Sequence, residues 1–371
     1  MSTCHLPLVT CLLSLVTRAL IRYLLGMSLK RVQNPPHAWN SVHLEWIDCP
    51  PPAQLEIYEE HAKTVLSEND SPDVGFRFSL NPYRGCFHAC AYCYARPTHQ
   101  YWDFGAGTDF ERKIIVKVNA PEKLREAFMK KSWQGELIAF SGNTDCYQPL
   151  ESNYELTRRC LQTCLEFRNP VGLITKSALI QRDIDVLAGL TKHARCFVHM
   201  SLAFADDAMA RKIEPGAPLP STRIRAIKAL TEAGVPVGVG LAPIIPGLND
   251  SQVAEILERA AEAGATRAFR VMLRLPSEVK PVFLERLREA YPDRAQKVEN
   301  AVREMRDGKL YNSTFGQRGK GKGERWEAIE WLFDLTCKRL GLNKHEENED
   351  RDDRPTTFRR PGEQVQMSLF E

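Results

Sequence analysis

The sequence has almost no excess of one charge, and it lacks an uninterrupted apolar run long enough to cross a membrane. Its 371 residues carry a net charge of only +3, which is too small to argue for nucleic acid or a membrane surface by itself. The apolar stretch from Leu6 to Leu25 is interrupted by Arg18 and Arg22, whereas a spanning helix needs about 20 apolar residues with few charges. We therefore expect no membrane partner.

Residues 1–30 allow three interpretations. In the first, the natural start is Met27 and the preceding residues are a mis-annotated extension. In the second, the segment is an amphipathic helix, and in the third it is a membrane anchor. A signal peptide is disfavoured because it needs positive charge before its apolar run, and only His5 precedes this one. Residues 31–75 form a proline-broken lead-in, in which 53–67 are expected to make one amphipathic helix.

The sequence also lacks the paired cysteine spacings of a zinc site or a disulfide framework. Its eleven cysteines are scattered along a long chain, which favours free thiols and a cytoplasmic location. Three stand together as Cys86-x3-Cys90-x2-Cys93, without the second Cys or His pair that zinc sites usually have. A cubane iron–sulfur cluster with full protein ligation would need four thiolates. Three leave one iron open, as a reactive cluster requires, so we favour iron–sulfur over zinc.

At these residues the sequence resembles the radical S-adenosylmethionine (SAM) superfamily, whose signature is a Cys-x3-Cys-x-aromatic-Cys run. The stretches Asn-Pro-Tyr-Arg-Gly-Cys at 81–86 and Cys-Ala-Tyr-Cys-Tyr-Ala-Arg-Pro at 90–97 resemble, more narrowly, the branch related to spore photoproduct lyase, a DNA repair enzyme. The resemblance covers roughly residues 68–275. It implies a [4Fe-4S] cluster on Cys86, Cys90 and Cys93, SAM as a cofactor, and a reducing partner such as flavodoxin or ferredoxin.

From residue 76 onward, apolar strands alternate with amphipathic helices, which indicates a parallel sheet covered by helices. The resemblance implies a partial (β/α)6 TIM-type barrel, in the α/β class, with a C-terminal helical extension and a disordered tail. We expect the barrel at 76–275, the extension at 276–342 and the tail at 343–371. The expected strands are 76–80, 114–118, 137–140, 171–175, 196–202, 235–241 and 268–273.

In such folds the chemistry lies just after the strands, and several polar residues stand there. Ser141, Asn143 and Thr144 suit the amino and carboxylate groups of SAM, although the same loop could merely cap the next helix. Lys176 and Ser201 match strand-end residues that contact SAM in the resembled branch. Further SAM candidates are Glu214 and Arg223, which could equally form an internal salt bridge, and Tyr92, which could equally be core packing.

The resembled branch uses a cysteine after the third strand as hydrogen donor, and Gly142 occupies that place here. Cys146 is a substitute donor on our interpretation, with Tyr147 as a weaker one. Tyr94, directly after Cys93, is expected to shield the reactive site. The missing donor argues against repair of spore photoproduct itself.

The C-terminus resembles the short motif with which bacterial repair enzymes and polymerases dock on the DNA sliding clamp. Gln366 would make its polar contact, while Leu369 and Phe370 enter an apolar pocket, and Met367 replaces the usual leucine. The loop at 311–323 is rich in Gly, Lys and Arg and could grip a phosphate backbone, or could be only a flexible connection.

These features predict a radical SAM enzyme, with lyase-type repair of damaged DNA as its reaction and DNA and the sliding clamp as partners. Two alternatives stay open. One is a radical SAM enzyme that acts on a small molecule, RNA or a protein. The other is a non-catalytic iron–sulfur protein that senses DNA.

Overall fold

A computed structural model describes residues 55–344 and 356–362. The expectations for residues 1–54 and for the motif at 366–370 fall outside these ranges. None of the helices in the described ranges is long and apolar enough to cross a membrane.

The main sheet has seven strands in the order β10-β9-β8-β7-β6-β3-β2. From β3 to β10 all neighbouring strands are parallel, and they lie across the sheet in the order in which they occur in the chain. Strand β2 is antiparallel to β3. In the described residues β10 and β2 are the edges, so the barrel is not closed. This confirms the predicted partial barrel. The bounds are β2 Leu66–Glu68, β3 Phe78–Leu80, β6 Ile138–Phe140, β7 Val171–Thr175, β8 Cys196–Ser201, β9 Val237–Ile244 and β10 Arg267–Met272.

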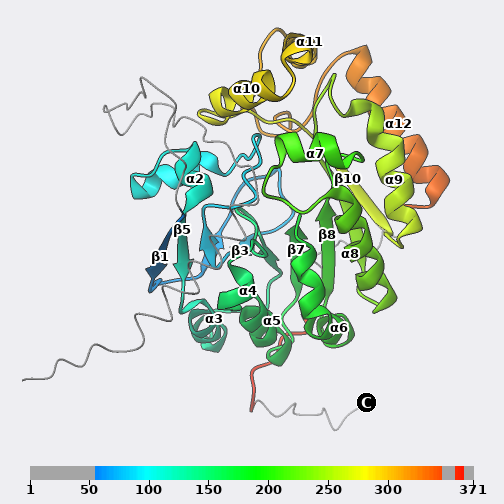
Figure 1. Ribbon diagram of the computed structural model, residues 1–371. Coiled ribbons are helices and arrows are strands. Elements are labelled where there is room, and N and C mark those ends of the chain that lie inside the picture. The colour runs from blue at the N-terminus through cyan, green and yellow to red at the C-terminus, as the bar shows by residue number, and fades with distance from the viewer. Residues whose placement is uncertain (1–54, 345–355, 363–371) are drawn as a thin grey trace, which may run out of the picture.

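Helices connect successive strands and cover the outer face of the sheet (Figure 1). Their apolar side chains recur every three or four residues, so that one stripe packs on the strands. In α5, for example, Leu156, Cys160, Leu161 and Cys164 are buried. Glu155, which adopts a left-handed conformation with φ of 51°, divides the helical stretch at 151–166 into two helices. The bounds are α3 Ala120–Met129, α4 Glu151–Tyr154, α5 Leu156–Glu166, α6 Ile184–His193, α8 Pro220–Glu232 and α9 Val253–Glu262.

Two expectations for the N-terminal part are wrong. The described part of the helix expected at 53–67 is not helical: residues 55–67 contain β1 (Glu56–Glu60) and the start of β2. The strand expected at 114–118 is β5 (Lys113–Lys117), and it belongs to a second sheet with β1 and β4 (Tyr83–Arg84). Ile57 pairs with Ile114 in parallel register. Long-range strand pairing therefore overrides the local helical pattern.

The C-terminal extension contains α10 (Val279–Ala290), α11 (Pro292–Glu304) and α12 (Glu324–Leu340). The loop at 311–323 spans the open side of the barrel. Gly319 O accepts a hydrogen bond of 2.8 Å from the amide of Met272 on β10, and Arg318 forms an ion pair with Asp73, which precedes β3. Arg318 also donates to Ser71 Oγ at 2.5 Å. Arg318 and Gly319 of the predicted phosphate-gripping loop thus join the two edges of the sheet.

Residues 356–360 were expected to be disordered with the rest of the charged tail, and this is wrong for them. Phe358 stacks on Phe167 with ring centroids 6.0 Å apart and meets Phe128 edge-on at 5.6 Å. Arg360 donates to the backbone oxygens of Phe128, Lys130 and Trp133. These partners end α3 and α5, so the segment is fixed at the end of the barrel where the strands begin.

Replacing Phe358 with alanine should lower the free energy of unfolding by roughly 1–3 kcal/mol, because the side chain is half-buried between two aromatic rings. Urea denaturation measures this change. Trp331→Ala, at an exposed position of α12, is the matched control and should change stability by less than about 0.5 kcal/mol. Equal stability of Phe358→Ala and the unaltered protein would show that the segment is not docked.

Candidate active site

The three clustered cysteines lie on one loop after β3 and β4, at the end of the barrel where the strands terminate. All three thiols are free; Cys86 and Cys90 are buried and Cys93 is partly buried. The loop has little regular structure, so single hydrogen bonds fix it: the amide of Cys86 donates to Phe110 O and that of Ala91 donates to Ile213 O, both at 2.9 Å. The loop is therefore attached to two separate parts of the fold.

Arg96 is the main brace of this loop, and sequence reasoning did not single it out. Its guanidinium is fully buried. Nε and Nη2 donate to Cys90 O at 3.2 and 2.9 Å, and Nη1 donates to the oxygens of Ala106 and Gly107. Nη2 also forms an ion pair of 2.5 Å with Glu111. The signal in the sequence that could have revealed it is an arginine only three positions after the last cysteine of the motif.

Gln148 and Gly216 hold the loop from the other side. The amide of Phe87 donates to Gln148 Oε1, and Gln148 Nε2 donates to Gly85 O, each at 3.2 Å. A Cβ atom on Gly216 would lie 1.9 Å from Phe87 O, so only glycine allows this approach. The amide of Gly216 in turn donates to His88 O at 3.0 Å.

Five of the predicted SAM-binding residues form one hydrogen-bonded network beside the loop. Tyr92 donates its hydroxyl hydrogen to Glu214, which is ion-paired with Arg223. Arg223 donates to Ser201 O at 3.1 Å, and Lys176 Nζ donates to Ser201 Oγ at 2.9 Å. Lys176 Nζ also lies 5.7 Å from the centre of the Tyr92 ring. The ends of β7 and β8 are thereby connected to the residue before Cys93.

Asp145 links this network to the cysteine loop. It accepts hydrogen bonds from Thr175 Oγ1 at 2.7 Å and from the amide of Lys176 at 2.8 Å, and it lies 3.3 Å from His88 Nδ1. Burial disfavours its charged form, but the His88 imidazole and these donors outweigh burial and hold the pKa of Asp145 at about 2. A permanent carboxylate thus stands behind the loop.

The comparisons with known proteins agree with this geometry. Residues 80–260 match the radical SAM superfamily. A protein of Mycobacterium tuberculosis, named only as uncharacterized, is 36% identical over 242 residues, which are 64% of this chain and 71% of that protein. The chain belongs to the radical SAM superfamily. Membership implies that SAM and an iron–sulfur cluster serve this site.

Two further similarities describe the relatives more closely. A structure of a spore photoproduct lyase variant with bound AdoMet and dinucleoside spore photoproduct has a TM-score of 0.57 and 15% identity, covering 77% of this chain and 80% of that one. This likeness shows a shared fold. A radical SAM Nalpha-GlyT isomerase of Pseudomonas phage M6 is 25% identical over 218 residues, which are 58% of this chain and 43% of that protein.

The cysteine loop fits the iron–sulfur cluster of the radical SAM superfamily. Burial raises the pKa of all three thiols, and neighbouring thiols raise the pKa of Cys86 and Cys90 further. Buried thiolates this close together need positive charge, which bound iron supplies. In the described ranges no three His, Cys, Asp or Glu side chains are grouped around a single metal position. Thiolates that each bind a different iron of one cluster need no such grouping.

Cys146 and Tyr147 stay predictions as hydrogen donors. Both are fully buried in the main core. The backbone oxygen of Cys146 accepts from Thr157 Oγ1 on α5 at 2.6 Å, and Tyr147 donates to Asp183, which directly precedes α6, at 3.0 Å. Tyr147 is thereby held against the start of α6, while Asp145 and Gln148 of the same loop contact the cysteine loop.

The other loop candidates for SAM have more limited roles. Thr144 donates to Tyr83 O and accepts from Asn81 Nδ2, at 2.9 and 2.8 Å, so its hydroxyl braces the backbone rather than facing a ligand, which corrects that prediction. Ser141 Oγ accepts a hydrogen bond from a backbone amide of the same loop. Asn143 is exposed and donates to a nearby threonine. Both stay candidates for SAM.

Tyr94 lies at the mouth beside these residues. Its side chain is 45% exposed, and its hydroxyl donates to Gly142 O at 2.9 Å. The glycine that occupies the expected position of the donor cysteine is thus in direct contact with the tyrosine that follows Cys93. Arg274, after β10, has its guanidinium carbon 5.4 Å from the Tyr94 ring centre.

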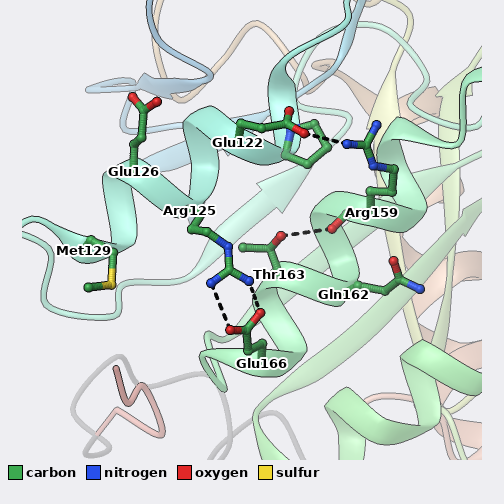
Figure 2. A pocket seen from close by; sticks show the side chains of 9 residues that line it. Glu122, Arg125, Glu126, Met129, Arg159, Gln162, Thr163 and Glu166 are labelled. Carbon is green, nitrogen blue, oxygen red and sulfur yellow. Dashed lines mark hydrogen bonds and ion pairs between the residues drawn. The ribbon is translucent and has the colours of Figure 1, made fainter. Parts of the chain in front are cut away.

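A separate groove lies elsewhere on the described surface. It has a volume of about 800 Å³ and lies between α3 and α5. Figure 2 shows the Arg125–Glu166 and Arg159–Glu122 ion pairs that cross it. These pairs are exposed and satisfy each other, and none of the cysteines lines the groove. The chemistry points to the cysteine loop, and we assign no function to this groove.

Changing any one of Cys86, Cys90 and Cys93 to serine should remove most of the iron from anaerobically reconstituted protein, because a serine hydroxyl does not replace a thiolate ligand. Iron and sulfide analysis measures the loss. Cys337→Ser, which changes a buried cysteine of α12, is the control and should retain the iron. A similar iron content in all four variants would contradict the assignment.

Proposed function

We propose that this protein is a radical SAM enzyme with a [4Fe-4S] cluster that carries out lyase-type repair of damaged DNA. The observation that carries the radical SAM part is the network of Tyr92, Glu214, Arg223, Ser201 and Lys176, which adjoins the three buried thiols. It gathers charges of both signs and hydroxyl groups at strand ends, where this fold binds its ligands.

Each part of the network has a role toward SAM. Cys86, Cys90 and Cys93 would hold the cluster, which when bound supplies the electron that breaks a carbon–sulfur bond of SAM to give a 5′-deoxyadenosyl radical. The Lys176 ammonium would pair with the SAM carboxylate, and the Ser201 hydroxyl holds that ammonium in place. Glu214 would accept from the ribose hydroxyls, while the ion pair with Arg223 orients it.

Tyr94 is our candidate for relaying a hydrogen atom. A relay must reach both the SAM site and the substrate, and Tyr94 is adjacent in sequence to Cys93 while nearly half of its side chain is exposed. Its hydroxyl is fixed on Gly142 O. Cys146 is fully buried, whereas the Tyr94 side chain is exposed at the mouth.

A DNA lesion as substrate is supported by two independent features. The fold is shared with a spore photoproduct lyase variant that holds a dinucleoside lesion, and the sequence ends in the clamp-like motif around Leu369 and Phe370. Recruitment by the sliding clamp, reduction by a flavodoxin or ferredoxin, and a cytoplasmic location belong to the same proposal. The isomerase name of the phage relative favours a rearrangement as the second candidate reaction.

DNA that carries lesions should stimulate SAM cleavage, since substrate binding brings a hydrogen donor to the radical and commits the reaction. We expect ultraviolet-irradiated duplex DNA to raise 5′-deoxyadenosine formation at least about fivefold over undamaged DNA of the same sequence. Chromatographic quantification of 5′-deoxyadenosine measures it. Equal rates of SAM cleavage with irradiated DNA, with undamaged DNA and without DNA would contradict a DNA substrate.

The purified protein should bind the sliding clamp of its host, and Leu369→Ala with Phe370→Ala should weaken binding at least about tenfold, because the two apolar anchors would be lost. Surface plasmon resonance measures the affinity. Met367→Leu is the informative partner variant, since it restores the usual residue and should bind at least as tightly. Undiminished binding by the double variant would refute the motif.

A further inference from the structure

Helix α10 carries an arginine where a packed helix would carry an apolar side chain. Val279, Val282, Phe283 and Leu287 form its buried face, and Arg286 lies on that same face. Only 5% of Arg286 is exposed. Arginine is almost never so fully buried unless it is paired, so this position needs a specific explanation.

The pairing of Arg286 within the described residues is incomplete. Its Nε and Nη2 atoms are buried and have no hydrogen-bond partner there. Nη2 lies 3.8 Å from Glu111 Oε1, but that oxygen already accepts the 2.5 Å bond from Arg96. Burial lowers the pKa of Arg286, and Glu111 only partly offsets this effect. Two buried guanidinium groups thus share one carboxylate, which leaves a buried positive charge.

This charge lies against the cysteine loop. Arg96, which shares Glu111 with Arg286, binds the backbone oxygen of Cys90 directly. At the other end of α10, the ring of Tyr291 lies 4.7 Å from Lys212 Nζ of α7 (Asp207–Ile213), and α7 ends at Ile213, which binds the loop. Figure 1 shows α10 and α7 at the same end of the barrel.

An uncompensated buried charge is costly, and removing the cost requires an anion. The anion that this loop is built to hold is a cluster with three cysteine thiolates. We propose that Arg286 is a positioning residue for the iron–sulfur cluster, directing its unpartnered N–H groups and positive charge toward it from the C-terminal extension. The inference rests on the cluster of the proposed function and adds that the bound cluster further stabilises the position of α10.

A positive charge near a cluster stabilises its reduced form, which carries one more negative charge, and so raises its reduction potential. Reconstituted Arg286→Met should therefore show a more negative midpoint potential than the unaltered protein in an EPR-monitored titration without SAM. Arg286→Lys, which keeps the charge, should recover most of the shift. Arg288→Met is the matched control on the same helix, since Arg288 is exposed and paired with Glu299 at 2.7 Å, and it should leave the potential unchanged.

Hydrogen exchange of the unaltered protein gives a second, independent measurement. Cluster loading should slow amide exchange in residues 279–290, and this slowing should be smaller in Arg286→Met. A cluster-loaded Arg286→Met with an unchanged potential, or exchange in α10 that is indifferent to loading, would overturn the role of Arg286 while leaving the radical SAM assignment intact. Failure of the unaltered protein to take up any iron would overturn both.

Discussion

The cysteine loop has little regular secondary structure, so it lacks the backbone hydrogen bonds that hold a strand in place. The buried guanidinium of Arg96 fixes the loop instead. It holds Cys90 O, Ala106 O and Gly107 O at once and is neutralised by Glu111. Each bond to this charged group is worth more than a neutral one. With the loop fixed, the three thiols lie beside the C-terminal ends of β7 and β8, where Lys176 and Ser201 are located.

Charge balance explains why so many ionisable groups can be buried at this mouth. Glu214 is matched by Arg223, Asp145 by His88 and the donors of β7, and Glu111 by Arg96. Breaking one member of such a pair leaves an unpaired charge and costs about 3–5 kcal/mol. The three thiols and Arg286 stand outside these pairs, the thiols because burial disfavours their charged form and Arg286 because its N–H groups lack partners. A cluster balances both.

Much of the fold and the centre of the site could be predicted from the sequence. Strands β6 to β10 are short apolar runs that alternate with amphipathic helices, and the spacing of Cys86, Cys90 and Cys93 is a local pattern. Lys176 and Ser201 could be found because parallel strands place their ends together. The resemblance to a known family supplied the expected number of barrel units and the residues to look for.

The rest depends on contacts between distant parts of the chain. Residues 53–67 have a helical pattern, yet β1 forms because its partner β5 offers a complementary edge more than 50 residues away. Asp145 and Gln148 follow the same strand as Cys146, and their contacts with the cysteine loop appear only in the folded chain. Phe358 lies in a charged stretch, and only the ends of α3 and α5 create its binding position. Local sequence cannot reveal such partners.

The central claim is that the three-cysteine cluster leaves one iron for SAM, which Lys176 and Ser201 help to hold. EPR spectroscopy of the reduced, reconstituted protein with and without SAM tests it most directly. The account predicts a [4Fe-4S]⁺ signal whose g values shift when SAM is added, with the shift requiring at least about tenfold more SAM in Lys176→Met. A cluster signal that SAM leaves unchanged in the unaltered protein would contradict the account.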